Sequence, residues 1–242
     1  IKSFFLYFNL TLFFVIIEKL NNSNRKNMPI FEHVKEKVKN LVLVYLIIFV
    51  PMWLMYALQP IIFPIFKELL GVSPRNFQLG EIVSISISWL SHGNLEHIVG
   101  NSTVLFGLLW IVALLEKKPF KIIGILILLS GFATWLLGSP NSFHIGASGL
   151  VFALMGYILS VATFGKKFEY LIPIVLFGSG YSYSLYNGLI PQQNVSFAAH
   201  FGGFIAAIIW VILKTKHENK MNYNSINPKK SFLEKIKSKI NN

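Results

Sequence analysis

At its centre the chain reads His144-Ile145-Gly146-Ala147-Ser148-Gly149-Leu150-Val151-Phe152-Ala153-Leu154-Met155-Gly156-Tyr157. One serine, Ser148, stands between small residues, and an apolar run long enough to enter a membrane begins there. Its hydroxyl is either part of an ordinary helix start or a nucleophile. Because a serine alone does no chemistry, the function depends on whether other segments bring a base and oxyanion donors to the same depth.

The composition is that of an all-α polytopic membrane protein. Of 242 residues, 54% are hydrophobic and only 13% are charged, and the mean hydropathy is +0.58. The net charge of +12 could indicate nucleic-acid binding, but the lysines flank the apolar segments, which is the pattern that orients membrane helices. Cysteine is absent, so neither a disulfide framework nor a thiolate metal site is available.

Six apolar segments between residues 41 and 213 predict transmembrane helices, since a span needs about 20 residues. Pro60 and Pro64 are expected to end the first, and Gly178 and Gly180 make the fifth the least typical. Between the first two spans, residues 82–88 alternate apolar and polar side chains, which fits either a strand or an interfacial segment. The predicted spans are Leu41–Ile62, Leu95–Leu115, Ile122–Leu137, Ala147–Phe164, Tyr170–Leu185 and Phe197–Leu213.

The positions of the lysines predict the orientation of these helices. Lysines lie before span one, between spans two and three, between spans four and five, and after span six. The links between spans three and four and between spans five and six contain no charged residue. The positive-inside rule then places both termini in the cytoplasm and the starts of the even-numbered helices on the outer side. Residues 28–40 form a basic cytoplasmic N-terminus, and residues 214–242 form a lysine-rich cytoplasmic tail or membrane-surface helix.

Residues 1–27 form an apolar N-terminal extension. It could be a signal peptide or an extra span, but no small-residue cleavage site follows Ile17. We expect this extension to lie outside the functional core, since Met28-Pro29 opens a segment that would make a natural amino terminus.

Polar residues gather at three of the predicted outer helix starts. Span two begins near His92, His97 and Asn101, span four at Ser148, and span six at His200. Ionisable groups at membrane depth are costly and usually mark function. In this arrangement Ser148 would attack a carbonyl, and His200 would act as general base.

The same residues offer oxyanion donors. His97 and Asn101 are four residues apart and share one helix face, and the Ser148 N–H lies at a helix amino terminus. Small residues on span four, including Gly149, and Gly203 on span six would let the two backbones approach closely. No acidic residue in spans four or six is available to orient His200, which predicts a Ser-His dyad.

With these motifs in this order, the chain resembles rhomboid intramembrane serine proteases over residues 41–213. The resemblance implies Ser148 as nucleophile, His200 as base, and His97 and Asn101 as oxyanion donors. It also implies a structural His92, supporting roles for the small residues Gly146, Gly149 and Gly203, and cleavage of transmembrane substrates near their outer ends without a cofactor.

Two positions depart from the family pattern. Val83-Ser84 stands where many members have a Trp-Arg pair, which leaves open how the first loop is anchored. Phe152 stands where a tyrosine often stacks on the catalytic histidine, so the stacking is kept without the phenol hydroxyl.

Other interpretations of these residues rank lower. His144 is a rival base, but it precedes Ser148 in a loop. His92, His97 and His200 could bind a metal with Glu96, yet no His-Glu-x-x-His motif is present. A rhomboid-fold protein that binds membrane clients without cutting them is the alternative function, and the presence of both Ser148 and His200 argues against it. A transporter would carry charged residues near the midplane of facing helices or broken helices in repeated halves, and the sequence shows no such internal repeat.

The predicted partners are the bilayer and single-span or multi-span membrane substrates, with no metal and no nucleic acid. The fifth span and the loop Asn187–Ser196 are predicted to gate substrate entry. Richness in Lys, Asn, Ile and Phe suggests a bacterial source, and therefore the bacterial inner membrane.

Overall fold

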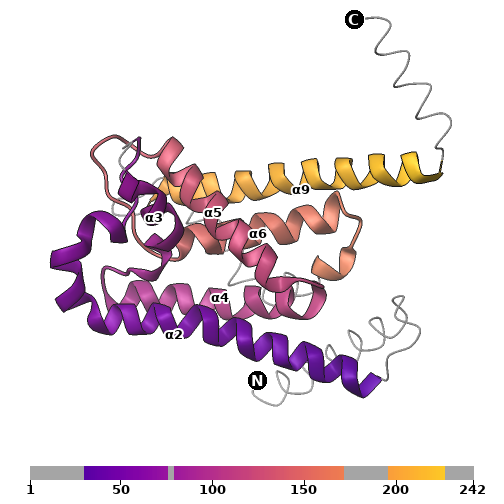
Figure 1. Cartoon of the computed structure of the whole chain (residues 1–242), viewed down its shortest axis with the longest axis horizontal. Coiled ribbons are helices and arrows are strands. Elements are labelled where there is room, and N and C mark those ends of the chain that lie inside the picture. Colours follow the sequence, from indigo (N-terminus) through magenta and orange to yellow (C-terminus); the bar gives the residue numbers. More distant parts are fainter. Residues whose placement is uncertain (1–29, 76–78, 172–195, 227–242) are drawn as a thin grey trace, which may run out of the picture.

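The computed structural model describes residues 30–75, 79–171 and 196–226, and nearly all of them are helical (Figure 1). In this part of the chain the extended structure is limited to one isolated antiparallel bridge, between Val72 and His144. The helices are α2 (Ile30–Leu70), α3 (Leu79–Ile87), the 3₁₀ turn η1 (Ser88–Leu90), α4 (Leu95–Leu115), α5 (Pro119–Leu137), α6 (Ser148–Thr163), η2 (Phe168–Leu171) and α9 (Phe197–Ile226).

Four of the described helices are long and apolar enough to cross a membrane: α2, α4, α5 and α9. The helix α6, at 16 residues, is apolar but shorter. The chain is therefore a helical integral membrane protein, as the composition predicts. The count of six spans and the cytoplasmic termini stay predictions, because most of the predicted fifth span and its gate loop lie outside the described residues.

Several helix boundaries follow from local sequence signals. The Asn94 side chain accepts a hydrogen bond of 2.8 Å from the His97 N–H, so α4 begins at Leu95, as predicted. Pro119 occupies the first turn of α5, where its missing N–H costs nothing, and this helix begins three residues earlier than the predicted Ile122.

Two sequence predictions about the helices are wrong, and one open question is resolved. Pro60 and Pro64 do not end the first helix, because α2 continues to Leu70 with non-helical dihedral angles only at Phe66. Of the two forms left open for the alternating segment, the strand is excluded, because the segment forms α3, in which the buried Ser84 hydroxyl donates to the Glu68 carbonyl. The last helix does not stop at Leu213 and extends to Ile226.

The helix α6 forms the centre of the bundle, and Figure 1 shows it between α4 and α9. Thirteen of its residues are buried, among them the fully enclosed Tyr157 and Leu154. A helix that is apolar on every side belongs inside the protein. The nucleophile candidate therefore stands at the start of the most enclosed helix.

Close packing between α6 and α9 depends on glycine. A Cβ on Gly203 would lie only 2.6 Å from the Gly149 carbonyl oxygen, and a Cβ on Gly156 would collide with the Phe204 backbone. In lipid, helices associate through such close contacts rather than through the hydrophobic effect. The packing between these helices thus supports the predicted small-residue contact.

Candidate active site

Ser148 is the first residue of α6 and is partly exposed. One turn further along the same helix, Phe152 stacks on the His200 ring, with 4.3 Å between ring centroids and an angle of 15° between the planes. Because residues four apart share a helix face, His200 lies over the face of α6 that begins with Ser148. The structure therefore brings the predicted nucleophile and base to the same end of one helix pair.

The contact between α6 and α9 sets how near these two residues can come. Gly149 follows Ser148, and a Cβ built on it would lie 3.7 Å from the Ala199 Cβ, next to His200. His200 is buried, with 7% of its surface exposed, and its backbone N–H donates to the Ser196 carbonyl. Its imidazole is thus buried and stacked on Phe152, and its backbone is fixed in the first turn of α9.

His97 and Asn101 gather over Gly146, two residues before Ser148. A Cβ on Gly146 would lie 2.7 Å from His97 Nε2 and 3.7 Å from Asn101 Nδ2. Gly146 also has a φ of 112°, a conformation that other residues adopt only with strain. Both reasons favour glycine here, and the two predicted oxyanion donors lie beside the loop that leads into Ser148.

His92 joins these groups through hydrogen bonds to both of its ring nitrogens. Its Nδ1 lies 3.2 Å from the Leu90 carbonyl, so Nδ1 carries the proton and donates. Its Nε2 then accepts from Asn101 Nδ2 at 3.0 Å and from the Ala147 N–H at 3.4 Å. Burial, with a further contribution from His97, lowers the pKa of His92 to about 4, so the ring is neutral at pH 7.

Gln59 was missed by the sequence reasoning. Its side-chain amide donates to the His92 carbonyl at 2.8 Å, and its oxygen accepts from the His92 N–H at 3.1 Å. This side chain from α2 therefore holds the backbone of the loop that carries His92. No local pattern could have found it, because the contact joins residues far apart in the sequence.

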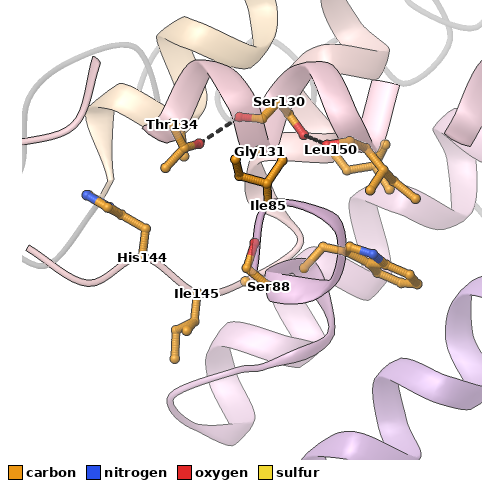
Figure 2. Close-up of a pocket in the computed structure, with 13 residues that line it drawn as sticks. Ile85, Ser88, Ser130, Gly131, Thr134, His144, Ile145 and Leu150 are labelled. Atoms are coloured by element: carbon orange, nitrogen blue, oxygen red, sulfur yellow. Dashed lines mark hydrogen bonds between the residues drawn. The ribbon is translucent and has the colours of Figure 1, made fainter. Parts of the chain in front are cut away.

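A cavity of about 20 Å³ lies behind the site, lined by Gly146, Gly149 and Ala199. Figure 2 shows Ser88, Ser130 and Thr134 around it, and the Thr134 hydroxyl donates to the Ser130 carbonyl at 2.7 Å. A volume of this size is enough for one water molecule. Gly149 and Ala199, the neighbours of Ser148 and His200, thus border a small cavity that has polar groups in part of its wall.

His144, the rival base, is committed elsewhere. The Ser142 hydroxyl donates to the Ser139 carbonyl at 2.5 Å, so its contact of 2.7 Å with His144 Nε2 requires the histidine to donate. Burial lowers the pKa of His144. His144 Nε2 therefore carries the proton and cannot take one from Ser148, which rules out this nitrogen as the base.

The metal alternative gains no support from the arrangement of the side chains. His92 and His97 contact each other edge to face, with 4.9 Å between ring centroids, whereas His200 stacks on Phe152. In the described ranges, no group of three His, Asp or Glu side chains could hold a metal ion.

Comparison with known proteins shows which family the chain is similar to. The chain is 29% identical over 147 residues to an uncharacterized protein of Mycobacterium leprae, covering 56% of this chain and 57% of that protein. It is 30% identical over 143 residues to uncharacterized proteins of Mycobacterium tuberculosis and Mycobacterium bovis, covering 54% of this chain and 58% of each. The chain thus spans a little over half the length of these relatives. The model of the Rhomboid domain matches residues 79–217, which include Ser148, His200, His97 and Asn101. This chain belongs to the rhomboid family.

Proposed function

We propose that the protein is an intramembrane serine endopeptidase that uses Ser148 and His200 as a catalytic dyad. The observation that carries this proposal is the stacking of His200 on Phe152, one turn from Ser148 on the most buried helix. A general base is useful only within about 2.6 to 3.2 Å of the hydroxyl it deprotonates. The glycine contact between α6 and α9 supports such an approach.

In the proposed reaction, the Ser148 hydroxyl oxygen attacks the substrate carbonyl while His200 takes its proton. The tetrahedral intermediate carries its negative charge on the former carbonyl oxygen. His200 then gives the proton to the leaving amine, and an ester of Ser148 remains. Water, deprotonated by His200, hydrolyses this ester and regenerates the serine.

The oxyanion would be stabilised by the side chains of His97 and Asn101 and by the Ser148 N–H. An α-helix leaves its first four N–H groups without intrahelical partners, and Ser148 opens α6. The hydrogen bond from Asn101 to His92 uses one of its two amide protons, and the other remains for the substrate. His92, neutral and fixed in one tautomer, would thus orient an oxyanion donor.

The family and the apolar helices support membrane-embedded substrates. We propose that single-span or multi-span membrane proteins are cut near the outer membrane face, because all candidate groups lie at one end of the bundle. The proposed location is a bacterial inner membrane, with which the mycobacterial relatives agree.

The test is cleavage of a single-span model substrate by the purified protein in liposomes. Ser148→Ala and His200→Ala should each abolish cleavage. Ser160→Ala, on the same helix, and His217→Ala, exposed on α9, are the matched controls and should cleave like the wild type.

The alternative function would follow from a different result. If the wild type cuts none of several substrates, and a fluorophosphonate fails to label Ser148, the dyad is wrong. The protein would then be a rhomboid-fold protein that binds membrane clients without cutting them.

A further inference from the structure

A short segment between α2 and α3 holds the loop that leads into Ser148. Val72 and His144 form an antiparallel bridge in which each N–H donates to the other residue's carbonyl at 2.9 Å. Val72 is buried, with 1% of its surface exposed. The two residues lie far apart in the sequence, so this bridge joins the segment after α2 to the loop before α6.

Arg75 extends the same contact to the end of α5. Its guanidinium donates to the Gly138 carbonyl at 2.9 Å, and its backbone N–H donates to the Trp135 carbonyl at 3.2 Å. The last carbonyls of a helix lack intrahelical partners and favour a cation. Arg75 makes these bonds with a φ of 58°, a strained conformation that persists only where the surroundings fix it.

An aromatic contact closes the other end of the segment. The Phe143 ring fills the space that a Cβ on Gly71 would need. Lys67 lies 5.4 Å from the centroid of this ring, and Phe63 packs against it edge to face at 6.0 Å. The loop that leads into Ser148 is therefore held by contacts to Phe143 and His144, and Arg75 binds Gly138, where the loop begins.

A second attachment lies closer to the serine. The Gly146 N–H donates to the Ser88 carbonyl at 3.1 Å. The segment Gly71–Arg75 is itself tied to α3, since the buried Glu81 carboxylate accepts from the Ser73 N–H at 2.8 Å. The path from Gly138 to Ser148 is thus fixed at several points on both sides.

We propose that Gly71–Arg75 together with Phe143, here named the outer clasp, positions Ser148 for catalysis, with Arg75 and Phe143 as its positioning residues. The inference rests on the proposed protease function. The clasp's segment Gly71–Arg75 lies just before the region matched by the family model, residues 79–217, and Phe143 lies within that region. The clasp also answers how the first loop is anchored without a Trp-Arg pair, since Val83 is 43% exposed and makes no such anchor.

The clasp acts by geometry alone. It touches neither substrate nor the reacting atoms, so its loss should lower kcat while leaving KM nearly unchanged. Displacing reacting groups by about 1 Å can cost about a hundredfold in rate, and a partial loosening should cost about tenfold.

The experiment compares Arg75→Asn with Arg75→Lys and Lys166→Asn. Asparagine tolerates a positive φ, so Arg75→Asn removes the guanidinium without adding backbone strain. Lysine can still donate to the Gly138 carbonyl. Lys166 is the matched control, since it is an exposed cation with a φ of 54° at the opposite end of α6.

Rates are measured per active site, counted by fluorophosphonate labelling of Ser148. Arg75→Asn should lower both kcat and the labelling rate about tenfold, with KM within about twofold of the wild type. Arg75→Lys should recover part of the loss, and Lys166→Asn should match the wild type. A merely structural role would lower the number of active sites and leave the rate of each unchanged, which would overturn the clasp.

A disulfide gives an independent reading. A hydrogen-bonded antiparallel pair has Cα atoms about 5.5 Å apart, which a disulfide can bridge, and the chain has no other cysteine. Val72→Cys with His144→Cys, added to Arg75→Asn, should restore the rate when oxidised and lose it when reduced. The two single cysteine variants are the controls.

The outcomes separate the two proposals. An oxidised protein that is inactive and regains activity on reduction would mean that the segment must open, and would overturn the clasp. A wild type that is neither labelled nor active would overturn the protease function and the clasp's role in it. A labelled, active wild type that Arg75→Asn leaves unchanged would overturn the clasp alone.

Discussion

Replacing Gly203 by alanine tests whether the contact between α6 and α9 sets the catalytic geometry. The new methyl group would lie 2.6 Å from the Gly149 carbonyl oxygen, whereas ordinary contact begins at 3.4 Å, so the helices must separate by about 0.8 Å. Gly149 adjoins Ser148, and Gly203 lies one turn after His200. The same separation would therefore be imposed on the proposed hydrogen bond between nucleophile and base.

The expected cost is large for so small a change. A misplacement of about 1 Å can lower a rate about a hundredfold, which corresponds to about 2.7 kcal/mol in the activation free energy. Overpacking should also lower the free energy of unfolding by about 1 to 3 kcal/mol. We expect kcat in liposomes to fall by nearly two orders of magnitude while KM changes little.

The matched control is Gly124→Ala, because a Cβ on Gly124 in α5 would meet nothing within 4 Å. This variant should keep the wild-type kcat and be slightly more stable, since alanine favours a helix more than glycine does. Thermal unfolding and fluorophosphonate labelling are measured on both variants. A folded Gly203→Ala protein with the wild-type kcat would refute the reasoning.

Three further predictions concern the polar groups. Asn101→Ala should lower kcat by about a hundredfold with KM nearly unchanged, because one oxyanion donor is lost. Steady-state kinetics would measure both constants, and an unchanged kcat would exclude Asn101 as an oxyanion donor. Glu116→Ala should lower the melting temperature without changing kcat per active site, since the carboxylate accepts hydrogen bonds from Tyr157 and Tyr170 at the opposite end of α6. The pKa of His92 is about 4 in the folded protein and 6.5 in the unfolded protein, so between these pH values the unfolded state binds more protons. The free energy of unfolding should therefore fall by up to about 3 kcal/mol as the pH drops from 6.5 to about 4. Melting temperatures against pH should show a shallower decline for His92→Ala, and parallel curves would contradict this.

Some of the fold follows from the sequence because local signals decide it. Asn94 caps α4, and the apolar run after it ends at Leu115, so both boundaries could be predicted. Prolines misled the prediction for α2, which contains Pro51, Pro60 and Pro64. In membrane helices, neighbouring groups can satisfy the carbonyls that proline leaves free, so proline is a weaker stop signal than in water.

The residues of the candidate site also divide into those that local spacing predicts and those that it does not. The spacing of His97 and Asn101 on one helix face is local, and the structure places both side chains beside Gly146. The contacts of Gln59 and Arg75 are not local, because their partners are the backbone carbonyls of His92 and Gly138. Every residue has a backbone carbonyl, so the sequence does not show which carbonyl a side chain binds. Hydrogen bonds to carbonyls are therefore found only from the three-dimensional structure.

The order of the chain has a consequence for biosynthesis. The candidate nucleophile opens α6, while the candidate base belongs to α9, the last helix described, which completes the packing around Gly149 and Gly156. During translation the serine therefore enters the membrane before its base exists. Under the proposed function, a nascent chain could not cleave neighbouring membrane proteins at the insertion site, and activity would begin only when synthesis of the helical domain is complete.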